Sequence, residues 1–449
     1  MSLAAALRLA QAQPEGRAWL ATIEPCDLPA DPVPRWAALP RGGRTLFAVD
    51  GGYLLAQGEV WSAEADGPGA TTWLARAHAR LEALTVAEPL GAQASACLDL
   101  PLVLTAQTFE DTGPGPGHWG PHLPGKRLWL PRRWWWRRAD GRGWCGSALA
   151  VSSAMTPARL AEELAAAATP PVIAASTPWP SLATDFVEQV ADAVDLINDG
   201  ALRKVVLARA VDEPCPHDEV QVLARLLAAA GAGTTVYAHD LADGGLFCGA
   251  TPEVLIEGHG NRVRAMALAG SCPRGAHPAE DLAALADMLS STKQRKEHGL
   301  VVEHVVAVLR PRSQPFAIAS TPHQRAEGSL IHLQTLVEAD LLRRDYLDVI
   351  GALHPTPAVC GLPQATAAHY IRRHERLQRG LYAGVLGWLT SDACRTVVPL
   401  RGGILAPDRT SARLFAGAGI VETSDPQTEL AETELKLAPM RHALGAPFS

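Results

Sequence analysis

Charged residues at positions that should face a protein core are the strongest constraint in this sequence. The pattern from Lys293 to Arg310 predicts a helix with one apolar stripe. Glu297 falls on this stripe, in line with Val301, Val305 and Val308. Because burying an unpaired charge is costly, a carboxylate among valines is either a surface residue at the margin of the stripe or a functional group. Glu297 is therefore a candidate site residue.

A lysine occupies a similar position on a predicted strand. Phe186, Val190, Val194 and Ile197 share one face of a helix that ends near Asp199. The strand Lys204 to Arg209 follows, and its alternation places Lys204 on the same face as Val206 and Ala208. Taken alone, Lys204 has a simpler explanation, namely an edge-strand lysine with a packed stem and a hydrated ammonium group.

A third charged group lies near the C-terminus, where Glu429, Glu432 and Lys436 project from one face of a predicted helix. Glu432 and Lys436 alone would be an ordinary pair that modestly supports the helix. Two carboxylates on separate helices, without histidine or cysteine at zinc-ligand spacing, are typical of Mg²⁺. The glycine-rich segment Gly417, Ala418 and Gly419 lacks the context of a dinucleotide site, but its amides could bind a carboxylate.

The amino-acid composition limits the kinds of protein that this sequence can encode. The 449 residues are 47% hydrophobic and 19% charged, which allows one large α+β unit with a substantial core. The net charge of -7 gives no basic surface for nucleic acid. The eight scattered cysteines form no Cys-x-x-Cys pair, and neither a secretory signal nor a membrane span is expected. We expect a cytoplasmic protein, a monomer or weak homodimer, with no nucleic acid or membrane partner.

Seven ordered motifs join these residues. They are KVVLAR at 204–209, FCGATPEVL at 247–255, ALAGSCPRG at 267–275, KQRKEH at 293–298, HPTPAVCGLP at 354–363, RGLYAGVLGW at 379–388 and GAGIVETSDPQTELAETELK at 417–436. Their order resembles the chorismate-binding family of anthranilate, aminodeoxychorismate, isochorismate and salicylate synthases. The resemblance spans roughly residues 178–444, so we expect a catalytic core over 176–449. Residues 1–175 are expected to be an N-terminal part of the same unit that matches only weakly.

The resemblance implies an α+β fold of two large packed antiparallel β-sheets flanked by helices. It also implies a small-molecule substrate, chorismate, and Mg²⁺ as cofactor. Glu297 and Glu432 correspond to metal ligands, with Glu429 in the first or second shell of the ion. Arg401 corresponds to the residue that grips a substrate carboxylate. Further substrate-binding positions are Gly270, Ser271, His332, Ala358, Tyr382, the 417–419 amides and Lys436.

The branch of the family depends on which nucleophile reaches the ring. Lys204 and Glu253 match the base and acid of isochorismate formation, in which water attacks C2 and the C4 hydroxyl leaves. Burial favours the neutral amine of a lysine and the protonated form of a glutamate. Ala269 and Ala358 replace a lysine and a threonine of other branches, and Gln364 replaces a lysine of anthranilate synthases. The sequence therefore predicts an isochorismate synthase. The alternatives are a salicylate synthase, an amine-adding enzyme and an inactive chorismate-binding protein.

Overall fold

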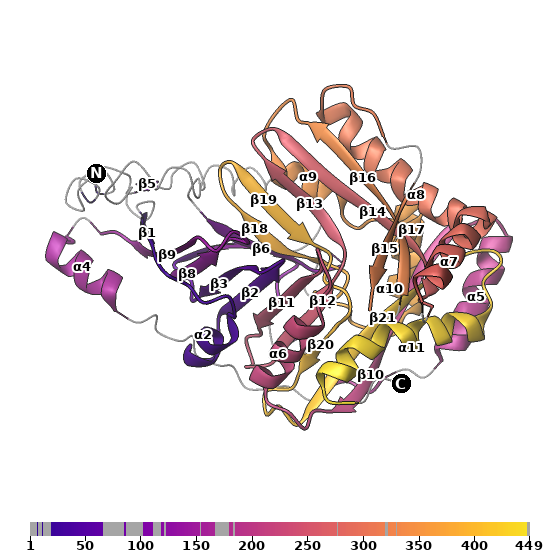
Figure 1. Ribbon diagram of the computed structural model, residues 1–449, viewed down its shortest axis with the longest axis horizontal. Helices are drawn as coiled ribbons and strands as arrows, with labels where there is room; N and C mark the ends of the chain where they lie inside the picture. Colours follow the sequence, from indigo (N-terminus) through magenta and orange to yellow (C-terminus); the bar gives the residue numbers. More distant parts are fainter. Residues whose placement is uncertain are drawn as a thin grey trace.

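Two large sheets form the centre of the protein (Figure 1). The structure is a computed structural model, and it describes residues 7, 11, 19–65, 85–86, 102–110, 118–120, 123–152, 154–166, 179–182, 185–275, 277–318, 322–328 and 330–446. Neighbouring strands pair in antiparallel fashion, with β1 and β5 as a parallel exception. The expected α+β fold with two packed antiparallel sheets is confirmed.

The first sheet contains twelve described strands. In spatial order they are β17 (Gly361–Leu362), β10 (Lys204–Pro214), β21 (Ser411–Ile420), β20 (Gly402–Leu405), β12 (Leu246–Thr251), β11 (Thr235–Asp240), β2 (Arg44–Val49), β3 (Gly52–Gln57), β8 (Arg133–Arg137), β9 (Gly143–Ala150), β1 (Trp19–Pro25) and β5 (Thr85–Val86). A strand of the N-terminal region pairs with a strand from the middle of the chain where β2 meets β11. The N-terminal region is thus part of the same sheet as the strand that begins with Lys204.

The second sheet contains nine described strands. Their order is β15 (His323–Glu327), β16 (Leu330–Asp340), β14 (Arg262–Pro273), β13 (Val254–His259), β19 (Ala393–Val397), β18 (Val385–Leu389), β6 (Val103–Gln107), β7 (Lys126–Leu130) and β4 (Trp61–Ala65). The chain crosses from the first sheet to the second between β12 and β13. It crosses back between β19 and β20. These two crossings carry Glu253 and Arg401.

Helices lie on the outside of the sheets (Figure 1). The described helices are α2 (Val33–Ala38), α4 (Pro157–Ala165), α5 (Phe186–Asn198), α6 (Glu219–Ala229), α7 (Pro278–Ser290), α8 (Thr292–Leu309), the 3₁₀ turn η2 (Arg310–Arg312), α9 (Tyr346–Leu353), α10 (Gln364–His374) and α11 (Pro426–Ala443). The predicted helix over 293–310 is α8, which begins where the Ser291 side chain accepts a hydrogen bond from Gln294 N. Within the described residues, no helix has both the length and the apolarity to cross a bilayer.

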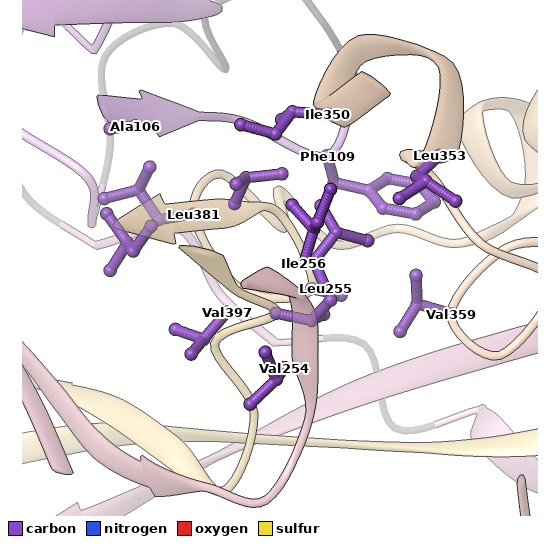
Figure 2. Close-up of a cluster of buried hydrophobic side chains, with 14 of the residues drawn as sticks. Ala106, Phe109, Val254, Leu255, Ile256, Ile350, Leu353, Val359, Leu381 and Val397 are labelled. Atoms are coloured by element: carbon purple, nitrogen blue, oxygen red, sulfur yellow. The ribbon is translucent and has the colours of Figure 1, made fainter. Parts of the chain in front are cut away.

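The main core joins the two sheets and anchors the first crossing. Figure 2 shows Val254, Leu255 and Ile256 of β13 packed among Ile350 and Leu353 of α9 and neighbouring apolar side chains. All five are at most 5% exposed. Because Glu253 directly precedes this packed segment, its backbone has little freedom. Two bonds hold it further: Val398 N donates to Glu253 O at 3.0 Å, and Glu253 N donates to Thr251 Oγ1 at 3.2 Å.

A buried ion pair fixes β10, the strand that carries Lys204. Arg379 Nε donates to Glu375 Oε1 at 2.6 Å, and both side chains are 1% exposed. The same two groups bond the strand directly, since Arg379 Nη2 donates to Val206 O at 2.7 Å and Ala208 N donates to Glu375 Oε2 at 2.8 Å. The pair therefore ties the segment after α10 to the backbone beside Lys204.

We predict that Glu375→Ala lowers the free energy of unfolding by about 3–5 kcal/mol, because it leaves the buried Arg379 guanidinium without a counter-charge. Denaturant unfolding followed by circular dichroism measures the loss. Glu338→Ala is the matched control, since Glu338 pairs with Arg262 on the surface and its removal should cost less than about 1 kcal/mol. Equal losses for the two variants would contradict the role of the buried pair.

Candidate active site

One cavity, between the sheets and helices α8 and α11, is lined by most of the predicted site residues. Among the predicted site residues, those that line it are Glu253, Gly270, Ser271, Glu297, His332, Ala358, Arg401, Gly417, Gly419, Glu432 and Lys436. Eight different segments of the chain contribute these groups, and α11 supplies two of them. The site is therefore complete only when both sheets and both helices are in place.

A buried lysine and a carboxylate meet at one wall of the cavity. Lys204 Nζ lies 2.9 Å from Glu297 Oε1, and the two side chains are 1% and 14% exposed. Gly419 on the adjacent strand β21 leaves room for this pair, because a Cβ there would approach Glu297 Oε1 to 2.5 Å. The predicted valine stripe of α8 is also observed, with Val301 and Val305 each 1% exposed. Glu297 thus occupies the core-facing position that the sequence predicts, and Lys204 compensates its charge.

Glu253 lies at the first sheet crossing and is 4% exposed. Burial raises the pKa of its carboxyl group to about 7, although the positive charges of Arg401 and Lys204 act in the opposite direction. A large share of Glu253 is therefore protonated at neutral pH. The direction agrees with the expectation from burial, and such a group can donate a proton to a leaving oxygen.

Arg401 and His332 form a fixed polar wall. Arg401 Nη2 donates to His332 Nε2 at 3.2 Å. Burial, and then the positive charge of Arg401, hold the pKa of His332 well below its ordinary value, so the ring is neutral. Since Nε2 accepts from Arg401, the proton is on Nδ1, which lies 2.9 Å from Ser271 Oγ and 3.3 Å from Gly270 O. This chain of bonds attaches one edge of the guanidinium, at Nη2, to the wall of the cavity.

The backbone at Gly270 shapes the same wall. Gly270 has a φ of +81° and lies at a register shift in the pairing of β14 with β16. A Cβ at this position would approach Gln294 Oε1 to 2.5 Å, so a larger residue fits neither the backbone nor the space. Gln294 Oε1 is buried and has no hydrogen-bond partner among the described residues. An unsatisfied amide oxygen thus lies beside the carboxylates.

The oxygens of this wall match the requirements of a hard cation. Glu297 and Glu432 line the same cavity from α8 and α11, and each now contacts an ammonium group, of Lys204 and of Lys436 respectively. In the part of the chain that the structure describes, no three His, Cys, Asp or Glu side chains gather to hold an ion by themselves. Two carboxylates and a neutral oxygen suit Mg²⁺, which keeps several of its waters. The residues present therefore fit this ion.

Four predicted residues do not line the cavity. Lys204 is fully buried behind Glu297 and does not itself line the cavity. Glu429 is buried on α11 with Thr433 and Leu437 and is not among the cavity-lining residues, whereas Glu432, about one turn further along the helix, is. Ala418 also does not line the cavity, since it alternates with Gly417 and Gly419 along β21.

Tyr382 is the fourth of these residues. Its ring stacks on Phe415, at a centroid distance of 5.2 Å, and it is not among the cavity-lining residues. Burial raises the pKa of its phenol to about 12, so the hydroxyl stays protonated. Tyr382 packs behind β21 in this structure, where its hydroxyl lies close to Gly417.

Sequence reasoning missed one charged group at this site. Glu327, on the edge strand β15, has a side chain that is 9% exposed and a carboxylate oxygen 3.9 Å from Arg401 Nε. It belongs to none of the seven motifs. The segment HQRAE alternates polar residues, which is typical of an exposed edge strand, so no local signal marks Glu327 as buried.

Comparisons with known proteins agree with this arrangement. The family model described as "Chorismate binding enzyme" matches residues 43–445. A MenF protein of Mycobacterium tuberculosis is 39% identical over 286 residues, which are 61% of this chain and 76% of its own length. The isochorismate synthase EntC of Escherichia coli is 36% identical over 266 residues, which are 58% of this chain and 67% of its own length.

A solved structure extends the match to the whole fold. The menaquinone-specific isochorismate synthase MenF of Escherichia coli superposes with a TM-score of 0.76 at 24% identity, covering 99% of this chain and all of that one. At this identity the likeness concerns the fold alone, whereas the family model covers most of the sequence and includes every cavity-lining residue named above. This chain belongs to the family of chorismate-binding enzymes.

Proposed function

We propose that this chain is an isochorismate synthase, which converts chorismate to isochorismate with Mg²⁺ as cofactor. The observation that carries the proposal is the chemistry of the cavity wall. A partly protonated Glu253 lines it, and the amino group of Lys204 lies directly behind it, while Ala269 and Ala358 present only methyl groups. The names of the relatives EntC and MenF point to the same activity.

The reaction requires one base and one acid. The oxygen of a water molecule forms a bond to ring carbon C2 and gives up a proton, the ring double bonds shift, and the C4–oxygen bond breaks. The departing hydroxyl takes up a proton and leaves as water. One water enters and one leaves, so the product is an isomer of the substrate and needs no oxidant or amine donor.

Glu253 and Lys204 each carry out one of the two proton transfers. Glu253 donates the proton to the departing C4 hydroxyl, because its carboxyl group is buried and has a pKa of about 7. Lys204 accepts the proton of the attacking water after its amine has become neutral. Its contact with Glu297 keeps the amine directly behind the cavity wall. Proton transfer of this kind contributes roughly 10²–10⁴ to an enzymatic rate.

Arg401 holds the substrate by a carboxylate. A guanidinium forms two parallel hydrogen bonds with a carboxylate, which gives both affinity and orientation. The neutral His332 accepts one N–H of Arg401 and thereby leaves the other donors for the substrate. Lys436, which donates to Gly417 O at 2.8 Å, adds a second positive charge at the same cavity.

Glu297 and Glu432 are the residues that would hold Mg²⁺, with the amide oxygen of Gln294 nearby. When bound, the ion would neutralise the ring carboxylate of chorismate and so support the build-up of charge during the reaction. Gln294 is uncharged, so Glu297 and Glu432 contribute the two negative charges of these three side chains. The cavity-lining carboxylates and their lysine partners thus form a polar wall that fits both cation and substrate.

Incubation of the protein with chorismate and Mg²⁺, followed by chromatography, tests the proposed reaction. We expect isochorismate to accumulate without stoichiometric pyruvate and without a requirement for ammonia. Salicylate together with one equivalent of pyruvate would show that the chain is a salicylate synthase. Turnover only with ammonia or a glutaminase would identify an amine-adding enzyme, and chorismate binding without turnover would identify an inactive member of the family.

Glu297→Gln tests the assignment of the metal site. The amide removes one of two anionic ligands, so the Mg²⁺ concentration for half-maximal turnover should rise by roughly 10-fold or more. A titration of activity with MgCl₂ measures it. Glu303→Gln is the matched control on the same helix, because Glu303 is exposed. Superimposable titrations of the Glu297 variant and the unchanged protein would refute the role of Glu297 as a ligand.

A further inference from the structure

A buried carboxylate lies behind Arg401 on the side away from the cavity. Glu327 Oε2 is 3.9 Å from Arg401 Nε and 3.8 Å from His332 Nε2. Neither distance is a direct hydrogen bond. Glu327 is not among the cavity-lining residues, whereas Arg401 and His332 are. It therefore cannot touch a molecule in the cavity except through these two side chains.

The register of the sheet explains how Glu327 reaches this position. Arg325 of β15 pairs with His332 of β16, and His332 pairs with Ser271 of β14. Side chains two residues apart on a strand share a face, so Arg325 and Glu327 point to the same side as His332. The edge strand thus adds an outer row of charged groups to the polar wall.

The carboxylate of Glu327 is costly to bury in its present form. Its Oε2 atom has no hydrogen-bond partner among the described residues, although its side chain is only 9% exposed. A buried polar atom without a partner lowers stability by about 1–3 kcal/mol. Burial raises the pKa of the Glu327 carboxyl group to about 7, whereas the positive charges of Arg401 and the half-buried Arg325 favour its ionised form. Because the buried Glu327 carboxylate lowers stability, its presence is better explained by a role in function.

Arg401 needs a second point of attachment to hold one orientation. Its single side-chain hydrogen bond within the described part of the protein goes from Nη2 to His332, and one bond leaves the guanidinium plane free to rotate. Glu327 faces Nε, on a different edge of the group. Attraction at Nε together with the bond at Nη2 fixes the plane and directs the remaining N–H groups toward the cavity.

We infer that Glu327 is a positioning residue, which holds the Arg401 guanidinium in the orientation that receives the substrate carboxylate. The inference rests on the proposed function for the identity of the substrate. It adds to the reaction a residue outside the seven motifs, on a strand that contributes no group to the cavity. Loss of Glu327 should weaken substrate binding and leave the acid and base chemistry in place.

Steady-state consumption of chorismate by Glu327→Ala and Glu327→Gln tests the inference. We expect Glu327→Ala to raise KM by about 10-fold while kcat changes less than about 3-fold, because binding is lost equally in ground and transition states. Glu327→Gln keeps the shape and an acceptor oxygen, and we expect a smaller rise. Glu338→Ala, which removes an exposed carboxylate from the neighbouring strand, should leave KM unchanged.

A double-mutant cycle separates positioning from a general structural effect. Arg401→Lys removes the Nε–H that faces Glu327, so either Glu327 variant should change KM less than about 2-fold in that background. Equal effects in both backgrounds, an unchanged KM, or a fall in kcat alone would overturn the inference. The melting temperature identifies a variant that does not fold, in which case the cycle is run with Glu327→Gln. The assay follows the loss of chorismate and does not depend on which product forms. A failure of the inference about Glu327 is therefore distinguishable from a failure of the proposed function, in which a product other than isochorismate forms.

Discussion

The ion pair between Lys204 and Glu297 is the constraint on which the site depends. Two opposite charges can stay buried only if they remain together, and here they are held 2.9 Å apart by a strand and a helix. Glu375 and Arg379 bond the backbone of that strand, and Gly419 leaves the space for the pair. The architecture of two sheets and outer helices therefore serves to keep charged groups in an otherwise apolar interior.

Much of the local structure follows from periodicity. The helices α5 and α8 and the start of β10 lie where apolar spacing predicts them, and the Glu297 stripe faces the core. The sheet order does not follow from any local pattern. Pairs such as β11 with β2 join residues almost two hundred positions apart, and strands such as β11 and β12 are buried on both faces and show no alternation. Only the resemblance to a family predicts how these strands assemble.

In the cavity, too, some features follow from the sequence and others do not. Motif residues such as Glu253, Ser271 and Glu297 line it, because the order of the motifs carries their spatial arrangement. Ala418 and Tyr382 do not line it, since a motif defines a segment and not the direction of each side chain. Glu327 lies outside every motif, and its burial arises from packing across the edge of a sheet. Its contact with Arg401 is visible only in three dimensions.

Turnover of Lys204→Ala tests most directly whether the buried lysine performs the chemistry. We predict that kcat falls by roughly 10²–10⁴ while the fold and chorismate binding persist, because a proton acceptor is lost and the substrate contacts are not. Lys296→Ala, which removes an exposed lysine paired with Glu422 on the same helix as Glu297, should retain full turnover. Unchanged turnover of the Lys204 variant would contradict the account, since the water would then be activated by another group.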